Sequence, residues 1–207
     1  MQKCIHWLFL FLVLLFSCNS PIDNKPLPKI GNIKVVDGDT IYHTISPFKL
    51  LNQDSVLVEN SALSESIYVS DFFFMHCPTI CPRVKKQMLR LYDRYEDNPK
   101  VKLVSHTLDP KRDTPSKLKE YADNLEVDHS KWLFLTGDKE HIYDIKNDYF
   151  IAAMEDDSAP GGITHSGQII LVDTYGHVRS FAEGTDPEKV DEMFNDIDKL
   201  LKEYETN

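Results

Sequence analysis

Hydrophobic and polar residues alternate along this chain in a pattern that predicts strands and helices in succession. Pro47–Glu59 is apolar on either side of a polar centre at Asn52–Ser55, which predicts a hairpin, and the apolar run Ser66–Met75 predicts a buried strand. The further predicted elements are, in chain order, a helix that starts at Thr79–Pro82, a strand at 101–109, a helix at 112–125, a strand at 131–137, a short helix at 138–149, a hairpin at 167–184 and a closing helix at 186–204. This order predicts an α/β fold in which helices flank a mixed β-sheet.

Prolines sharpen two of the predicted helix starts. Pro78 and Pro82 confine one start to Thr79–Pro82, because proline is tolerated only in the first turn of a helix. Before the next helix, Asp113 or Thr114 is the expected N-cap and Pro115 the first helical residue.

The first residues predict export rather than a part of the fold. One early positive charge, Lys3, precedes an apolar run from Ile5 to Phe16, which is too short to span a bilayer well and has the length of a signal-peptide core. The end of this run, Leu15-Phe16-Ser17-Cys18, is similar to a bacterial lipobox, whose cysteine is acylated and becomes the first residue of the mature protein. Phe16 is bulkier than that motif usually has, so ordinary cleavage and an uncleaved anchor remain alternatives.

We therefore expect three parts: a signal peptide at 1–17, a lipidated tether at 18–42 and one domain at 43–207. The tether assignment rests on three prolines and few large apolar clusters. An acylated Cys18 would place the protein outside the cytoplasm, on a membrane and facing the periplasm.

Length and charge limit the classes of function. A chain of 207 residues suffices for one domain with a full core, and its composition is ordinary for a globular protein. The formal net charge of −10 argues against nucleic acid as a partner, because phosphate binding requires a basic face.

Two cysteines carry the candidate chemistry. Of the four present, Cys4 leaves with the signal peptide and Cys18 takes the lipid, which leaves Cys77 and Cys81. They lie where the strand at Ser66–Met75 gives way to a helix, as in a thioredoxin-like fold, and a helix start lowers the pKa of a thiol. They could form a structural disulfide, exchange electrons or bind a soft metal ion. Three residues separate them, against two in ordinary thioredoxins, which favours metal binding.

A third ligand is expected to be histidine, and His165 is the best candidate. It follows a glycine pair and directly precedes a strand, and in a thioredoxin-like fold the loop that enters this strand faces the cysteine-bearing turn. His76 adjoins Cys77 but is expected to point away, and His106 is expected in the core with a hydrogen bond to the backbone. The histidines expected at the surface are His43, His129, His141 and His177.

Three motifs together resemble the Sco/SenC family: "DFFFMHCPTICPRV", "SHTLDPKRDTP" and "ITHSGQIILVDTYGHVR". The resemblance extends over roughly Asp39 to Tyr204. It implies a thioredoxin-like fold that binds one copper ion through Cys77, Cys81 and His165. It also implies an exported, membrane-tethered protein that helps to assemble the copper centre of subunit II of respiratory cytochrome c oxidase.

Two positions depart from the family pattern. Many members have aspartate where this chain has Thr79, and many have aspartate directly before the histidine, where this chain has Thr164. A carboxylate there could orient the imidazole, so Asp71, Asp109 and Asp113 are candidate replacements.

The donor chemistry independently favours copper. Two thiolates prefer soft Cu(I), and an added imidazole also accommodates Cu(II); zinc remains an alternative. The leading interpretation is a copper carrier, a binding protein that catalyses no reaction. Its expected partner is subunit II, and other periplasmic copper carriers or thiol reductants are further expected partners. The rival is a thiol-disulfide reductase that keeps the oxidase's copper-ligand cysteines reduced, in which Cys77 attacks and Cys81 resolves.

Overall fold

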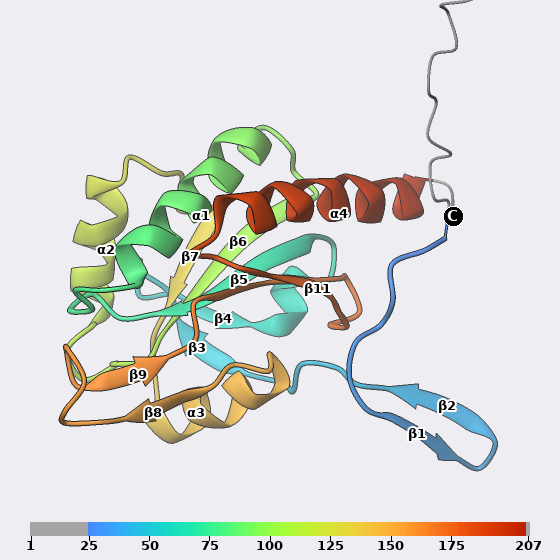
Figure 1. The fold of residues 1–207 in the computed structure, drawn as a ribbon, viewed down its shortest axis with the longest axis horizontal. Helices are drawn as coiled ribbons and strands as arrows, with labels where there is room; N and C mark the ends of the chain where they lie inside the picture. The colour runs from blue at the N-terminus through green and yellow to red at the C-terminus, as the bar shows by residue number, and fades with distance from the viewer. Residues whose placement is uncertain (1–24, 206–207) are drawn as a thin grey trace, which may run out of the picture.

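The computed structural model describes residues 25–205 and has one central mixed sheet (Figure 1). Three parallel strands form its middle and one side: β5 (Ile67–Phe73), β6 (Val101–Thr107) and β7 (Trp132–Leu135). On the other side of β5, β10 (Gln168–Val172) runs antiparallel, and β11 (Val178–Glu183) pairs antiparallel with β10 at the edge. The sheet order is β11-β10-β5-β6-β7, which confirms the predicted mixed sheet.

Helices cover both faces of this sheet. The apolar positions of α1 (Cys81–Tyr95), α2 (Pro115–Asn124) and α4 (Pro187–Glu205) pack in one core cluster against one face. The opposite face is covered by α3 (Lys139–Asp148) and by the small hairpin of β3 (Lys49–Leu51) and β4 (Leu57–Glu59), which a 3-10 turn at Asn60–Leu63 follows. Central strand β5 is buried along its whole length, because its alternate side chains enter the two clusters.

The sequence pattern predicted these elements to within a few residues. Helix α1 begins at Cys81 with Pro82 in its first turn, and α2 begins at Pro115 with Thr114 at the N-cap position. The side chain of Thr114 makes no capping hydrogen bond. Asp113 is instead buried and accepts hydrogen bonds from Thr107 Oγ1 at 2.6 Å and from the backbone N–H of Met75 at 3.1 Å.

Two small hairpins were not predicted. One pairs β8 (Ala153–Glu155) with β9 (Ile163–His165), and the other pairs β1 (Ile33–Val36) with β2 (Asp39–Tyr42). The second lies inside the range expected to be a tether. Its turn is Asp37–Gly38, both with positive φ, which is the two-residue turn that suits a tight hairpin.

The chain before this hairpin is also part of the packed structure. Arg179 Nη2 donates to the carbonyl of Leu27 at 2.7 Å and Nε donates to that of Pro28 at 3.1 Å, while Glu203 Oε1 accepts from the N–H of Leu27 at 2.6 Å. Ile30 then pairs with Val178 in an isolated bridge. Ordered contacts therefore begin well before residue 43, where we expected the domain to start.

In the described part of the chain, no helix combines the length and the apolar character needed to cross a membrane.

Candidate metal centre

Both cysteines lie at the end of the central strand where the chain turns into α1. After β5 ends at Phe73, the N–H of Cys77 donates to the carbonyl of Phe74 at 3.2 Å, which closes a turn, and Cys81 is the first helical residue. Cys77 is buried and Cys81 half-buried, and both are free thiols. This placement follows from the apolar strand and the two prolines that delay the helix.

His165 comes to the same point from a distant part of the chain. It ends strand β9, and its Nε2 lies 3.3 Å from Cys81 Sγ and 3.9 Å from Cys77 Sγ. The three donor atoms all lie within 4.8 Å of one another. The predicted convergence of these three side chains on one point is present in the structure.

A backbone carbonyl orients the imidazole. His165 Nδ1 lies 3.0 Å from the carbonyl oxygen of Ser166, and the ring meets the edge of Phe74 with centroids 5.5 Å apart. Because a carbonyl only accepts, Nδ1 carries the proton and the lone pair of Nε2 faces the two sulfurs. The structure thus gives a main-chain oxygen the role that a carboxylate could have had.

None of the three candidate aspartates takes that role. Asp71 accepts a short hydrogen bond from Ser105, and Asp109 forms a salt bridge with Arg112. Asp113 accepts hydrogen bonds from Thr107 and from the backbone of Met75. The two positions that depart from the family pattern have their own contacts. Thr79 Oγ1 lies 3.7 Å from Cys77 Sγ, and Thr164 Oγ1 donates to Asp156 at 3.3 Å.

Comparison with known proteins assigns this arrangement to a family. The model of the SCO1/SenC family matches residues 37–202. The chain belongs to the SCO1/SenC family. Solved Sco structures share its fold, which confirms the predicted thioredoxin-like architecture.

Three solved structures illustrate the similarity. A SCO1/SenC family lipoprotein from Bacillus anthracis is 27% identical, with a TM-score of 0.70 over 76% of this chain and 95% of that one. Copper-bound ScoI from Arabidopsis thaliana is 26% identical, with a TM-score of 0.64 over 77% and 98%. BsSco, described as a Sco-family cytochrome c oxidase assembly protein with a disulfide switch, is 28% identical, with a TM-score of 0.66 over 76% and 93%.

The donor set of the Sco site fits a copper ion. Two sulfurs favour Cu(I), and the imidazole nitrogen extends the site to Cu(II). Among the described residues, these three form the one group of histidine, cysteine and acidic side chains whose donor atoms are close enough to share a metal ion.

The two thiols have different acidities. Burial raises the pKa of Cys77, but hydrogen bonds from the backbone N–H groups and the side chains of Cys81 and Thr79 together outweigh it and leave the pKa below that of an ordinary thiol. Burial raises the pKa of Cys81 well above its ordinary value, and the neighbouring Cys77 raises it further. Burial also lowers the pKa of His165, against the smaller opposing effect of its hydrogen bond to Ser166, so the ring favours the neutral form that binds metals.

Gly161 lets the β8–β9 hairpin, which carries His165, pack closely against the cysteine loop, the segment between β5 and α1 that carries Cys77. Gly161 has φ +86°, and a Cβ built there would lie 2.7 Å from a ring carbon of Phe74 and 2.9 Å from the carbonyl oxygen of His76. Arg112 Nη2 also donates to the Gly161 carbonyl at 2.9 Å. The glycine pair before His165 was visible in the sequence, but the close approach that requires Gly161 was not.

The other histidines lie outside this group. His76 is exposed, as its predicted orientation requires. His177 was expected at the surface and is buried, with Nδ1 2.9 Å from the carbonyl of His43, because the N-terminal segment covers it.

His106 was correctly placed in the core, but the predicted backbone hydrogen bond is absent. Within the described structure neither ring nitrogen has a partner. The ring stacks on Phe72 with centroids 4.8 Å apart and meets the edge of Phe48. Burial lowers its pKa to about 3, so this histidine is neutral at physiological pH.

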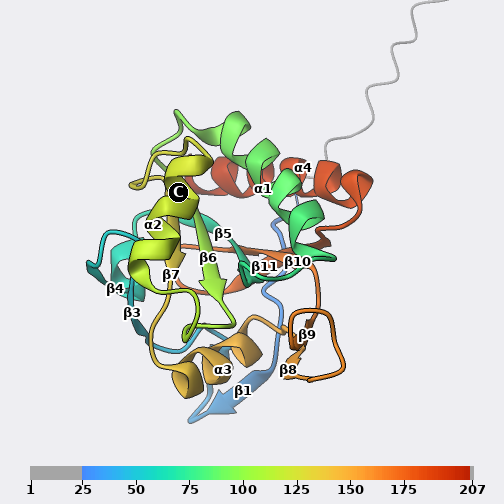
Figure 2. The same ribbon diagram turned by 90° about the vertical axis from the view of Figure 1, so that its left-hand side faces the viewer.

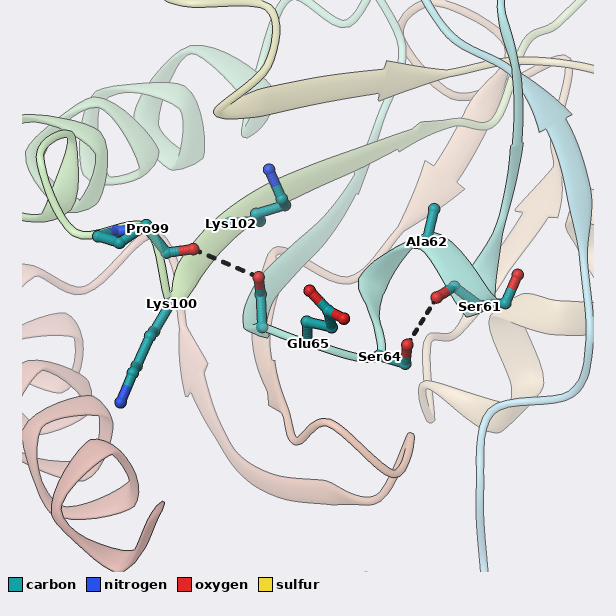
Figure 3. Close-up of a pocket in the computed structure, with 8 residues that line it drawn as sticks. Ser61, Ala62, Ser64, Glu65, Pro99, Lys100 and Lys102 are labelled. Carbon is teal, nitrogen blue, oxygen red and sulfur yellow. Dashed lines mark hydrogen bonds between the residues drawn. The ribbon is translucent and has the colours of Figure 1, made fainter. Parts of the chain in front are cut away.

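A shallow polar pocket lies at the opposite end of the parallel strands. It encloses about 490 Å³ and is lined by Ser61, Ala62, Ser64, Glu65, Ser66, Pro99, Lys100 and Lys102 (Figure 3). Two of its serine hydroxyls donate to nearby carbonyls, Ser64 Oγ to that of Ser61 at 2.7 Å and Ser66 Oγ to that of Pro99 at 3.4 Å. Lys102 Nζ donates to the carbonyl of Ser130 at 2.8 Å. The pocket shares no residue with the metal centre.

Proposed function

We propose that this Sco protein is a copper chaperone that delivers copper to the copper centre of cytochrome c oxidase subunit II, or helps that centre to mature. The proposal rests on one observation. Cys77 and Cys81, from the first of the three family motifs, and His165, from the last, bring their donor atoms to one point. A site with three protein donors leaves room for a donor from the acceptor protein, which suits an ion that has to be handed on. The naming of BsSco as an oxidase assembly protein supports the oxidase as the target.

In this proposal copper is the cargo, and each side chain has a separate task. Cys77 supplies the first thiolate, because its pKa is the lower of the two thiols. Cys81 must lose its proton as the metal binds, so loading releases a proton to solvent. His165 presents Nε2 because Ser166 holds the proton on Nδ1, which lets the same site bind both copper oxidation states.

We further propose that the protein is exported and held on the periplasmic face of a membrane by a lipid on Cys18. Cys18 lies outside the described residues, so the proposal rests on the sequence around it and on the likeness to the B. anthracis lipoprotein. Subunit II is the proposed partner, together with other periplasmic copper carriers or thiol reductants.

The second candidate is a thiol-disulfide reductase that keeps the oxidase's copper-ligand cysteines reduced. The unequal acidities of Cys77 and Cys81 favour it, since an attacking thiol needs a low pKa. Attack of the Cys77 thiolate on a partner disulfide forms a mixed disulfide and releases one partner thiol. Cys81 then attacks Cys77, which releases the second partner thiol and leaves Cys77 and Cys81 as a disulfide.

Replacement of His165 separates the two functions. We expect His165→Ala to keep Cu(I), bound by the two sulfurs, and to lose most Cu(II) binding, whereas its rate of disulfide reduction stays near that of the unmodified protein. Cys77→Ser or Cys81→Ser should each abolish tight Cu(I) binding. The experiment titrates both copper states and measures disulfide reduction for each variant; unchanged Cu(II) affinity together with impaired disulfide exchange in His165→Ala would favour the reductase and reject the chaperone.

A further inference from the structure

The hairpin β1–β2 is an apolar ribbon without a protein core behind it. All eight of its strand residues are exposed, and five of them are large hydrophobic residues: Ile33, Val35, Val36, Ile41 and Tyr42. Val35 is 71% exposed and Ile33 59%. Figure 1 shows the hairpin projecting from the body of the domain. A two-stranded hairpin is marginally stable alone in water, and exposed apolar surface of this kind marks an interaction site.

The two faces of this ribbon differ in charge. The strand register pairs Ile33 with Tyr42 and places Val35 on the same face, which carries no charged strand residue. The opposite face carries Lys34 and Asp39. At one end of the first face the Tyr42 ring meets His177 of the domain, with centroids 5.8 Å apart, and Lys29 Nζ lies 4.4 Å from its centroid. The freely exposed part of this face, Ile33 and Val35, is apolar, so a partner there has to be apolar.

The N-terminal chain is fixed close to this hairpin. Arg179 is buried, contacts Asp173 at 3.1 Å and Glu203 at 2.7 Å, and donates to the carbonyls of Leu27 and Pro28. The chain is thus bound to the domain from Leu27 onward, six positions before β1 begins.

The anchor that we propose comes only a short way earlier. Cys18 precedes Leu27 by nine positions, which span at most about 30 Å when fully extended. A lipid on Cys18 therefore holds the end of the domain that bears Leu27 and the hairpin close to the bilayer. In Figure 1 this end lies opposite β9, and in Figure 2, where the β9 side faces the viewer, the hairpin lies behind.

We propose that the face of the hairpin with Ile33, Val35 and Tyr42 rests on the membrane and contacts the boundary between lipid headgroups and acyl chains. This inference rests on the proposed anchor at Cys18. The lipid is expected to be zwitterionic, because a chain with a net charge of −10 is repelled by an anionic leaflet. The carboxylates of Asp37 and Asp39 at the turn favour a ribbon that lies flat over one that inserts tip first.

Tryptophan quenching tests this contact on the full processed protein. The test variant is Val35→Trp, and the matched control is Lys34→Trp, which places the tryptophan on the opposite face of the hairpin. Both proteins are purified from membranes and reconstituted into phosphatidylcholine vesicles with or without brominated acyl chains. Any native tryptophan is common to both variants, so the difference between them belongs to the hairpin. We expect bromine to quench the emission of Val35→Trp at least twofold more than that of Lys34→Trp.

Each other outcome overturns the proposal and identifies what failed. Equal quenching in vesicle-bound protein rejects the hairpin contact and leaves the anchor intact, whereas protein that does not sediment with vesicles rejects the anchor and the contact together. Protection of Val35→Trp from aqueous iodide that grows with protein concentration, without bromine quenching, shows that a second copy covers this face. Copper titration of the same samples reports on the proposed metal function separately.

Discussion

His165 Nε2 lies 3.3 Å from Cys81 Sγ, although 84 positions separate the two residues in the chain. The contact joins the start of α1 to the end of β9, which belongs to a two-stranded sheet outside the central one. The site therefore depends on how the β8–β9 hairpin is held against the cysteine loop as well as on its donor atoms.

Gly161→Ala should displace His165 from the two sulfurs. The added methyl group would lie 2.9 Å from the carbonyl of His76, and backbone cannot move away as a flexible side chain can. We expect Cu(II) affinity to fall roughly tenfold, equivalent to about 1.4 kcal/mol, with Cu(I) affinity little changed. The measurement is a titration of each oxidation state.

Gly162→Ala is the matched control for this variant. Gly162 has φ +87°, nearly the value of Gly161, but a Cβ there meets nothing within 4 Å. Both substitutions strain the backbone by about 1 kcal/mol, so only the contact with the cysteine loop differs. An equal loss of Cu(II) affinity in both variants would show that backbone strain, and not the contact, is responsible.

The two thiols should ionise in separate steps. Burial raises the pKa of both thiols, but at Cys77 the hydrogen bonds from Cys81 and Thr79 outweigh it and leave the pKa below that of an ordinary thiol. In the metal-free protein, thiolate absorbance near 240 nm should rise in a first step below the ordinary thiol pKa and in a second step well above it. Cys81→Ser should keep the first step and Cys77→Ser should lose it. If Cys77→Ser keeps the low step, the assignment of the two thiols is reversed.

Acid should destabilise the domain through His106. Its folded pKa of about 3 lies below that of an unfolded histidine near 6.5, so the unfolded chain binds a proton first as the pH falls. The free energy of unfolding is therefore unaffected by this ring above pH about 6.5, falls as the pH drops below that value and levels off near pH about 3. The total fall in unfolding free energy is on the order of 5 kcal/mol.

Denaturant unfolding at a series of pH values tests this expectation. His106→Leu should flatten the dependence of unfolding free energy on pH across that range, and it removes two buried nitrogens without partners. The exposed His76→Gln should behave as the unmodified protein. An acid dependence that persists unchanged in His106→Leu would assign it to other groups.

Cys18→Ser should release the protein from the membrane into the soluble exported fraction. Stable anchoring requires more than one weak signal, so the contact proposed for the β1–β2 hairpin cannot hold the domain alone. Cell fractionation with immunodetection measures the change, and Cys4→Ser, which alters a residue of the predicted signal peptide, is the control. A Cys18→Ser protein that stays fully membrane-bound and uncleaved contradicts lipidation.

The sequence predicted the strand and the helix on either side of the two cysteines, because their signals are local, but it did not predict the β8–β9 hairpin that carries His165. The apolar run of β5, the prolines beside Cys77 and the glycine pair before His165 each act within a few residues. The family motifs then indicated that Cys77, Cys81 and His165 belong together, a relationship that no local pattern contains.

Features that depend on contacts between distant segments were missed. The buried position of His177 exists because the chain around His43 folds back over it, and the β1–β2 hairpin was hidden by the prolines that precede it. The carbonyl of Ser166 could not be identified as the imidazole's partner, because every residue offers a carbonyl and only the folded geometry brings this one to His165 Nδ1.

The buried contacts of Arg179 determine how mechanical load passes through the molecule. A pull on the N-terminal segment is resisted by the hydrogen bonds that Arg179 on β11 donates to the carbonyls of Leu27 and Pro28, and by the one that Glu203 on α4 accepts from the N–H of Leu27. Neither of these two elements contributes a donor atom to the metal centre. A load on the N-terminal segment therefore enters the domain through β11 and α4, and not through α1 and β9, which carry Cys81 and His165.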